Sequence, residues 1–173
     1  VWPLFSRSAN TNLQSNFYLW PIYKYNRFQS PPLERERTRI LFFLYSDIEE
    51  KLLEEDVSKR RVDLWPLFTF RRDLYGQERL QILALLEPIL PNNKSIERNY
   101  SPLWSLWRAE KNPKTEASSQ SLLWNLYRRD VTAASKKCSL LFGLFQYESH
   151  PQGKRWRLFY FPFGAETSKP NTQ

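Results

Sequence analysis

The segment Leu64-Trp65-Pro66-Leu67-Phe68 is the main indication of the fold, because variants of it recur along the whole chain. Close copies stand at Val1-Trp2-Pro3-Leu4-Phe5 and Leu19-Trp20-Pro21-Ile22-Tyr23. With the Trp as the reference position, the equivalent residues are Trp2, Trp20, Phe42, Trp65, Glu87, Trp104, Trp124, Phe142 and Phe159, separated by 17 to 23 residues. A period of this length is typical of a fold built from one repeated supersecondary unit.

Each copy is predicted to form one β-strand. The apolar runs are short and rich in aromatic residues, which favours strand over helix. Pro, Ser, Asn or Gly often follows the reference residue, and this predicts a bulge in the middle of each strand. The polar stretches between the copies are predicted to be loops. These stretches are 6–16, 26–39, 71–79, 91–99, 111–120, 130–137 and 149–155.

The predicted fold class is all-β, an antiparallel meander of about nine short strands that is closed or sandwiched. Alternate residues of a strand lie on opposite faces, and both faces of each apolar run are apolar at its centre, so both faces would need cover. A β-solenoid is the alternative, and an outer-membrane barrel is a third architecture that suits aromatic-rich strands. The predicted structural repeat core consists of Trp2, Trp20, Trp65, Trp104, Trp124, Phe142 and Phe159.

The domain prediction is a single repeat-built β domain over 1–164, followed by a polar tail over 165–173. A short helix is predicted within 46–58, because Ser46 and Glu49 have the spacing of a capping box. A charged hairpin tip is the alternative for the same residues. Since the chain opens inside a copy of the repeat and lacks Met, we expect it to be a fragment or a processed part of a longer chain.

Composition argues against catalysis and against a bound cofactor. The chain has 173 residues, a single cysteine, Cys138, and a single histidine, His150. There is no CxxC or HExxH metal motif and no glycine-rich phosphate loop, and no nucleophile is accompanied by a recognisable base. We therefore predict no catalytic residue, no metal site and no cofactor.

The net charge of +8 permits binding to an anionic partner. Arginines stand next to aromatic residues at several ends of the apolar runs, and such pairs are able to hold phosphates or stack on rings. The predicted anion contacts are Arg71, Arg72, Arg108, Arg128 and Arg129. Basic and acidic residues alternate elsewhere, so a solvated rim is the competing interpretation and nucleic acid is a disfavoured partner.

The phrase Leu64 to Asp73, with its echo Leu123 to Asp130, resembles uncharacterised bacterial proteins that carry tandem LWPLF-type segments, several of which are exported to the envelope. The resemblance implies a location in the bacterial cell envelope, whether outer membrane, periplasm or extracellular, and it supplies no functional residues.

The sequence therefore predicts a non-enzymatic structural or interaction protein of an envelope or extracellular assembly. Its aromatic repeats would pack against a protein partner, against a second copy or against a second sheet, and membrane contact is also open. The alternatives are an outer-membrane barrel or pore and a basic module that binds anionic glycan, lipid or nucleic acid.

Overall fold

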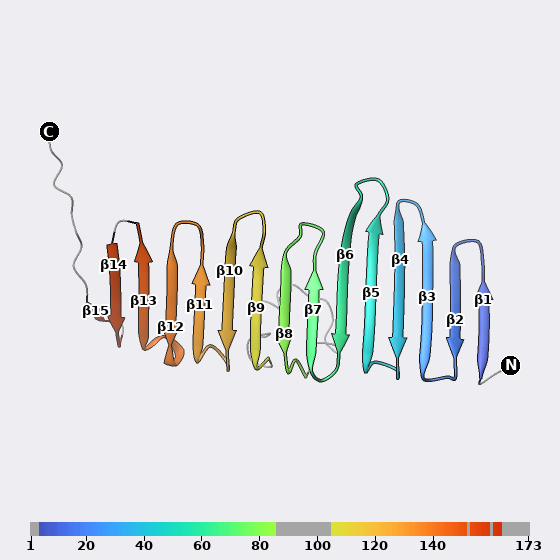
Figure 1. The fold of residues 1–173 in the computed structure, drawn as a ribbon, viewed down its shortest axis with the longest axis horizontal. Coiled ribbons are helices and arrows are strands. Elements are labelled where there is room, and N and C mark those ends of the chain that lie inside the picture. Colours follow the sequence, from blue (N-terminus) through green and yellow to red (C-terminus); the bar gives the residue numbers. More distant parts are fainter. Residues whose placement is uncertain (1–3, 86–104, 152, 160, 164–173) are drawn as a thin grey trace.

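The computed structural model describes residues 4–85, 105–151, 153–159 and 161–163. These residues form one antiparallel sheet in which every strand pairs with the strands before and after it in the sequence (Figure 1). The strands are β1 (Phe5–Ala9), β2 (Leu13–Tyr18), β3 (Tyr23–Ser30), β4 (Leu33–Ile40), β5 (Tyr45–Leu52), β6 (Val57–Leu64), β7 (Phe68–Arg72), β8 (Glu78–Ile82), β9 (Trp107–Asn112), β10 (Ala117–Leu122), β11 (Tyr127–Val131), β12 (Lys136–Leu140), β13 (Phe145–His150), β14 (Gly153–Leu158) and β15 (Phe161–Phe163).

The predicted all-β antiparallel meander is confirmed, but the predicted strand number and closure are wrong. The described residues contain 15 strands rather than about nine, and the sheet is open, with β1 at one end and β15 at the other. Antiparallel pairing throughout also excludes stacked solenoid coils for these strands. Nothing in the described part of the chain forms a second sheet, so the sandwiched arrangement is wrong as well.

The difference in strand number arises because the repeated phrase lies at hairpin turns and not in strands. Trp20, Phe42, Trp65 and Trp124 all lie between strands, whereas the stretches predicted to be loops supply most of strands such as β1, β4 and β10. One repeat of about 20 residues therefore provides a complete hairpin, with two strands and two turns. Strand β4, Leu33–Ile40, has the sequence LERERTRI, which shows how polar these strands are.

The helix predicted within 46–58 is wrong, and the charged hairpin is what the structure shows. Strands β5 and β6 pair from Tyr45↔Leu64 to Leu52↔Val57, and residues 53–56 form the turn. Pairing places Glu49 opposite Arg60 and Glu50 opposite Lys59. Cross-strand pairs of opposite charge favour the hairpin over a helix.

The residue that follows the reference position has a turn conformation rather than a strand bulge. In two turns this residue is Asn125 (φ 69°) or Gly143 (φ 95°). Asn and Gly are the residue types that tolerate positive φ best, and Pro, as in Pro21 and Pro66, is favourable in turns. The small and cyclic residues that predicted a bulge therefore mark the turn itself.

Neighbouring turns are connected by main-chain hydrogen bonds. Within a turn, the N–H of Leu126 donates to the carbonyl of Leu123 at 2.8 Å. Between turns, the N–H of Leu141 donates to the carbonyl of Leu126 at 2.7 Å. The same lateral bond runs from Leu41 to Ile22 and from Phe159 to Leu144, at 2.8 Å in each case. The ladder thus continues into the turns and aligns them in a line.

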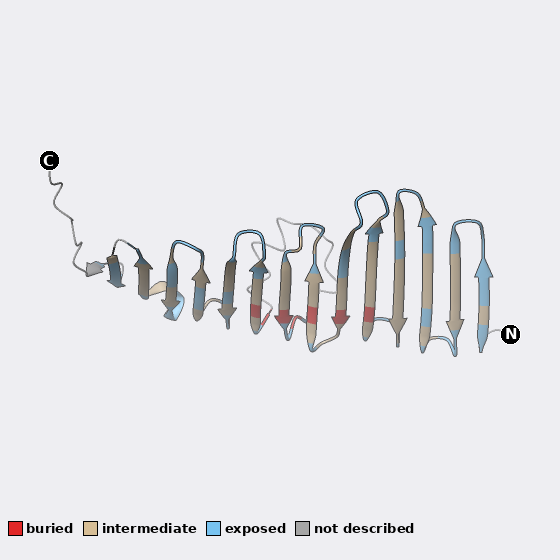
Figure 2. Ribbon diagram, turned by 45° about the horizontal axis from the view of Figure 1, so that its top comes forward, coloured by how far each residue is buried: buried red, intermediate tan, exposed pale blue. Residues whose placement is uncertain are grey.

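The sheet has almost no apolar core. Ala84 is the one buried hydrophobic residue among those described, and most strand residues are half-buried (Figure 2). Buried polar residues cluster in the central strands: Ser46, Asp63, Thr69, Gln81 and Arg108 pair across β5 to β9 in one row. Because apolar burial is scarce, the described strands depend on their hydrogen-bonded ladder and on cross-strand side-chain pairs.

Candidate functional site

One long edge of the sheet consists of exposed apolar turns, and we call it the apolar edge. Its described turns contain no charged residue. They comprise residues 4, 19–22, 41–44, 65–67, 83–85, 105–106, 123–126, 141–144 and 159. Large side chains in these turns are exposed: the fraction is 50% for Trp20, 57% for Trp124 and 61% for Phe142. A continuous exposed apolar surface of this kind marks an interaction site.

The described repeat residues that were predicted as buried core lie on this edge, and for them the prediction of burial is wrong. Trp20, Trp124, Phe142 and Phe159 are each at least half exposed, and Trp65 is half-buried. A single sheet offers no second layer against which turn residues could pack. Trp2 and Trp104 lie outside the described residues.

Immediately next to the apolar edge, one row of side chains crosses the whole sheet and is apolar or aromatic in all described strands. Register pairs its members in order from β1 to β15: Phe5, Tyr18, Tyr23, Ile40, Tyr45, Leu64, Phe68, Ile82, Trp107, Leu122, Tyr127, Leu140, Phe145, Leu158 and Phe161. We call this line the apolar row. Paired residues have their side chains on the same face, so the row occupies one face only.

Ring contacts connect side chains within the apolar row and within the apolar edge, and Phe145 of the row contacts Phe159 of the edge with ring centroids 6.3 Å apart. Within the row, the ring centroids of Phe5 and Tyr18 are 5.2 Å apart. Between turns, Trp20 contacts Phe42 and Phe43 contacts Trp65, both at 5.5 Å in edge-to-face geometry. Edge-to-face ring pairs at such distances are favourable beyond their burial.

The indole of Trp65 also fixes the edge by a hydrogen bond. Its Nε1–H donates to the carbonyl of Leu85 at 3.0 Å. This bond holds the ring against the adjacent turn, which explains why Trp65 is less exposed than Trp20.

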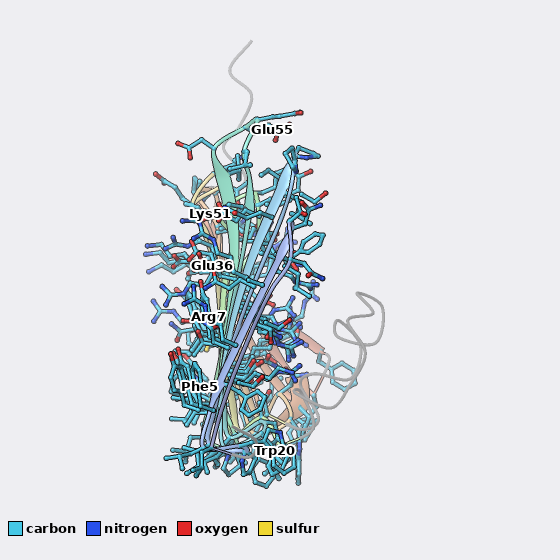
Figure 3. The ribbon with its side chains drawn as sticks, turned by 90° about the vertical axis from the view of Figure 1, so that its right-hand side faces the viewer. Phe5, Arg7, Trp20, Glu36, Lys51 and Glu55 are labelled. Carbon is cyan, nitrogen blue, oxygen red and sulfur yellow. The ribbon has the colours of Figure 1, made fainter. Side chains whose placement is uncertain are left out.

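The opposite long edge is polar, and we call it the polar edge. It consists of the turns 10–12, 31–32, 53–56, 73–77, 113–116 and 132–135, together with residue 151. Its side chains close the turns: Asp73 Oδ1 accepts from the N–H groups of Tyr75 and Gln77, both at 3.0 Å. Figure 3 shows the two edges together, with Trp20 at one end of the strands and Glu55 at the other. The molecule is therefore amphipathic along the strand direction.

The two faces of the sheet differ close to the apolar edge. On one face lies the apolar row; on the opposite face, one residue further from the edge, lies a row with the cations Lys24, Arg39, Arg108, Arg128 and Arg157 and the acid Asp63. We call this second line the basic row, and its side of the sheet the arginine face. Arg108 is buried and bonds to Glu110, and Arg128 bonds to Asp130. The positive charge behind the exposed rings therefore comes mainly from Lys24, Arg39 and Arg157.

The structure does not bring the five predicted anion contacts together. Arg108 and Arg128 lie in the basic row, and Arg71 lies on the same face, two residues further from the edge. Arg72 and Arg129 lie on the opposite face, because they are adjacent in sequence to Arg71 and Arg128.

Three of these arginines bind carboxylates. Arg72 bonds to Glu78 at 2.9 Å, Arg128 to Asp130 at 2.9 Å and Arg108 to Glu110 at 2.5 Å. Burial tends to raise the pKa of Glu110, but Arg79 and Arg108 outweigh it and lower that pKa below its ordinary range. Glu110 is therefore ionised at neutral pH and bridges both guanidinium groups, and its single negative charge offsets one of their two positive charges.

No cluster suited to holding a metal ion is present in the described ranges. No three His, Cys, Asp or Glu side chains among them gather around a point that could hold a metal ion. His150 bonds to Glu148 at 2.7 Å on the exposed end of β13. The described part of the chain also includes no helix suited to crossing a membrane.

Comparison with known proteins finds no family model that matches the chain, and no curated protein or solved structure that is significantly similar to it.

Proposed function

We propose that the chain is a non-catalytic peripheral membrane protein whose sheet stands on an anionic lipid surface, with the apolar edge inserted in the bilayer interface. The observation that carries this proposal is the uncharged, exposed apolar edge with the basic row directly behind it. Trp and Tyr favour the interface between lipid and water, and Lys and Arg near that depth bind anionic headgroups.

The depth of the apolar zone fits this orientation. Strand residues advance by about 3.3 Å each, so the apolar row and the turns beyond it together span roughly 7–10 Å. Interfacial elements bury their apolar part to a depth of about 5–10 Å. The basic row lies at the upper limit of this zone, level with the headgroups.

The shape of the edge favours a lipid surface over a groove in a protein. Fifteen strands spaced by about 4.8 Å make an edge roughly 70 Å long and one sheet thick. The turns vary between Trp-Pro, Phe-Phe, Trp-Asn and Phe-Gly at their centres while remaining apolar. A fluid bilayer accepts such variation along a straight line, whereas a matched protein groove would need specific side chains at each turn.

A role in the bacterial cell envelope, as the resemblance implies, accords with this proposal, since envelope membranes present anionic lipid. In that setting the polar edge and much of both faces would project into the aqueous phase. The chain would act there as a scaffold or coat on the membrane surface.

Vesicle binding tests the proposal. The double substitution Trp20→Ser and Trp124→Ser should weaken binding to vesicles that contain phosphatidylglycerol by roughly 30- to 1000-fold. Removal of each indole takes about 1–2 kcal/mol of apolar transfer energy from the binding free energy. Binding is measured by flotation with the intact chain. Thermal unfolding should change little, since both rings are at least half exposed.

Leu53→Ser is the matched control, because Leu53 is 56% exposed but lies in a turn of the polar edge. This variant should bind vesicles as the wild type does. Equal losses in both variants, or wild-type chain that stays with the soluble fraction, would overturn the proposal. So would a lipid-independent dimer that the two Trp substitutions dissociate, since a second copy would then be what covers the edge.

A further inference from the structure

Strand β4 carries three arginines on the arginine face. Arg35, Arg37 and Arg39 occupy alternate positions, so they point to the same side, about 7 Å apart along the strand. We call them the arginine ladder. It begins with Arg39 in the basic row and runs away from the apolar edge, toward the middle of the sheet.

The ladder has more positive charge than its neighbours neutralise. Arg35 bonds to Glu50 at 2.6 Å. Arg39 makes no contact with a carboxylate among the described residues, and its cross-strand partners are Lys24 and Ser46. A like charge directly opposite is unfavourable unless an anion lies between the two groups.

Arg37 is the most isolated member. Its cross-strand neighbours are Asn26 and Ile48, and its buried Nε has no hydrogen-bond partner. Burial lowers the pKa of Arg37, the neighbouring charges of Arg39, Arg35 and Arg61 lower it further, and Asp63 opposes them with a smaller effect. A buried N–H donor without a partner is costly, and a bound oxyanion would satisfy it.

A hollow of about 330 Å³ adjoins the ladder and is lined by Leu13, Asn26, Phe28, Arg35 and Arg37. A second hollow on the same face, between β11 and β14, also has several cations in its lining. There, however, two carboxylates also line the hollow and bind two of its cations: Asp130 bonds to Arg128 at 2.9 Å and Glu148 bonds to Lys137 at 2.7 Å. The hollow beside the ladder has no carboxylate in its lining, so it is the better anion site.

We propose that the arginine ladder and this hollow bind a ligand that carries two or more phosphate groups. Guanidinium groups donate parallel N–H bonds that match the geometry of phosphate oxygens. Three of them in a line, about 7 Å apart, span more than a single phosphate. The phosphates would bond to Arg37 and Arg39 and would neutralise the pair formed by Arg39 and Lys24.

Two sources of such a ligand fit the position. A soluble diphosphate could enter the hollow directly, and this possibility does not depend on membrane binding. A lipid headgroup with two phosphates could rise from the bilayer along the ladder, and this alternative rests on the proposed function.

Inorganic pyrophosphate is the probe for the site itself, measured by titration calorimetry on the intact chain without lipid. Wild type should bind it more tightly than it binds orthophosphate, and Arg37→Gln should weaken pyrophosphate binding at least tenfold. Arg37→Lys, which keeps the charge but loses the planar fork, should give an intermediate loss.

Arg129→Gln is the control, because it removes the same charge from an exposed position on the opposite face. It should leave pyrophosphate affinity within about twofold of wild type, the change that screened surface charge allows. Equal losses in Arg37→Gln and Arg129→Gln would overturn the inference, and so would the absence of any heat with wild type.

Vesicles separate the two sources. If the ligand is a headgroup, Arg37→Gln should reduce flotation with vesicles that contain a diphosphorylated lipid but not with phosphatidylglycerol vesicles of equal charge. If Arg37→Gln binds both kinds of vesicle as wild type does while losing pyrophosphate, the site takes soluble diphosphates. If wild type binds pyrophosphate but binds none of the vesicles, the phosphate site at the arginine ladder is supported and the proposed membrane binding is wrong.

Discussion

The apolar edge and the polar edge belong to the same hairpins, but their turns are formed by different kinds of residue. Polar-edge turns use residues that suit turns, as where the Asp73 carboxylate accepts two main-chain N–H groups. Apolar-edge turns place bulky side chains at positive φ, as at Leu123 (44°), Trp124 (53°) and Phe142 (57°). Such residues are unfavourable in that region by about 1–2 kcal/mol each. The residues of the apolar edge are therefore not those that would make its turns most stable.

Strained residues that persist in a structure are a reason to look for function there. Asn-Gly would form tighter hairpin turns than Leu-Trp or Leu-Phe. What the apolar residues provide instead is exposed surface along one line. The apolar edge is therefore expected to meet an external partner, whereas the polar edge has no such need.

An environment-sensitive label should distinguish the two edges most strongly. In a Cys138→Ser background, a nitrobenzoxadiazole label at Phe142→Cys should show a several-fold increase in fluorescence, with a blue shift, when anionic vesicles are added. The reason is that residue 142 lies on the apolar edge and would enter the interface.

The matched position is Ala133→Cys, in the turn at the other end of the same strand, β12. Its label should show no change on addition of vesicles. Similar responses at both positions would mean that the sheet lies flat on the membrane or does not bind by an edge, and the contrast would be broken.

Much of the architecture was predictable from sequence, but the register of strands and turns was not. The recurring phrase correctly indicated a repeated antiparallel β unit. The same phrase was wrongly assigned to the strands. Apolar, aromatic runs such as Leu41 to Leu44 usually indicate a strand, whereas here they form turns. In a sheet with both faces in water, strands such as β4 carry charges on each side and lose the apolar alternation that identifies a strand.

One signal in the sequence could have corrected the assignment. Pro21 and Pro66 stand in the middle of the phrase, and Pro in the centre of a run argues against a central strand. The apolar row could not have been found in the same way, because its members, such as Tyr23 and Ile40, come together only through strand pairing. The arginine ladder was hidden for the opposite reason: Arg35, Arg37 and Arg39 alternate with other residues inside a stretch that was predicted to be a loop.

Substitution of two phenylalanines should show how much the two ends of the strands contribute to the free energy of unfolding. Phe68 lies in the apolar row between Leu64 and Ile82, and Phe28 lies near the polar end of β3 and is 38% exposed. Phe68→Ala should lower the free energy of unfolding by about 2 kcal/mol, since a half-buried ring is lost. Phe28→Ala should lower it by less than about 1 kcal/mol.

Urea unfolding monitored by circular dichroism measures both variants. A cost for Phe28→Ala equal to that of Phe68→Ala would show that the apolar row is not the main source of apolar stabilisation. The two edges would then differ in the exposure of apolar side chains but not in their contribution to stability.

The smallest expected effect is a dependence of stability on pH. It should arise in the middle of the sheet, which relies on ion pairs, and not at the apolar end. Glu110 bonds to Arg79 at 2.6 Å, and its pKa is lowered from the ordinary 4.5 because the two arginines outweigh the effect of burial. A carboxylate with a lowered folded-state pKa stabilises the fold above its unfolded pKa, and this contribution is lost as the pH falls through the folded value. Wild type should therefore exceed Glu110→Gln in unfolding free energy at pH 7, and the difference should shrink below about pH 4.5. The loss of unfolding free energy in Phe68→Ala should stay constant over the same pH range, since no titrating group is involved. If the losses in both variants changed together with pH, a general effect of acid on the sheet would explain the result instead of the local ion pair.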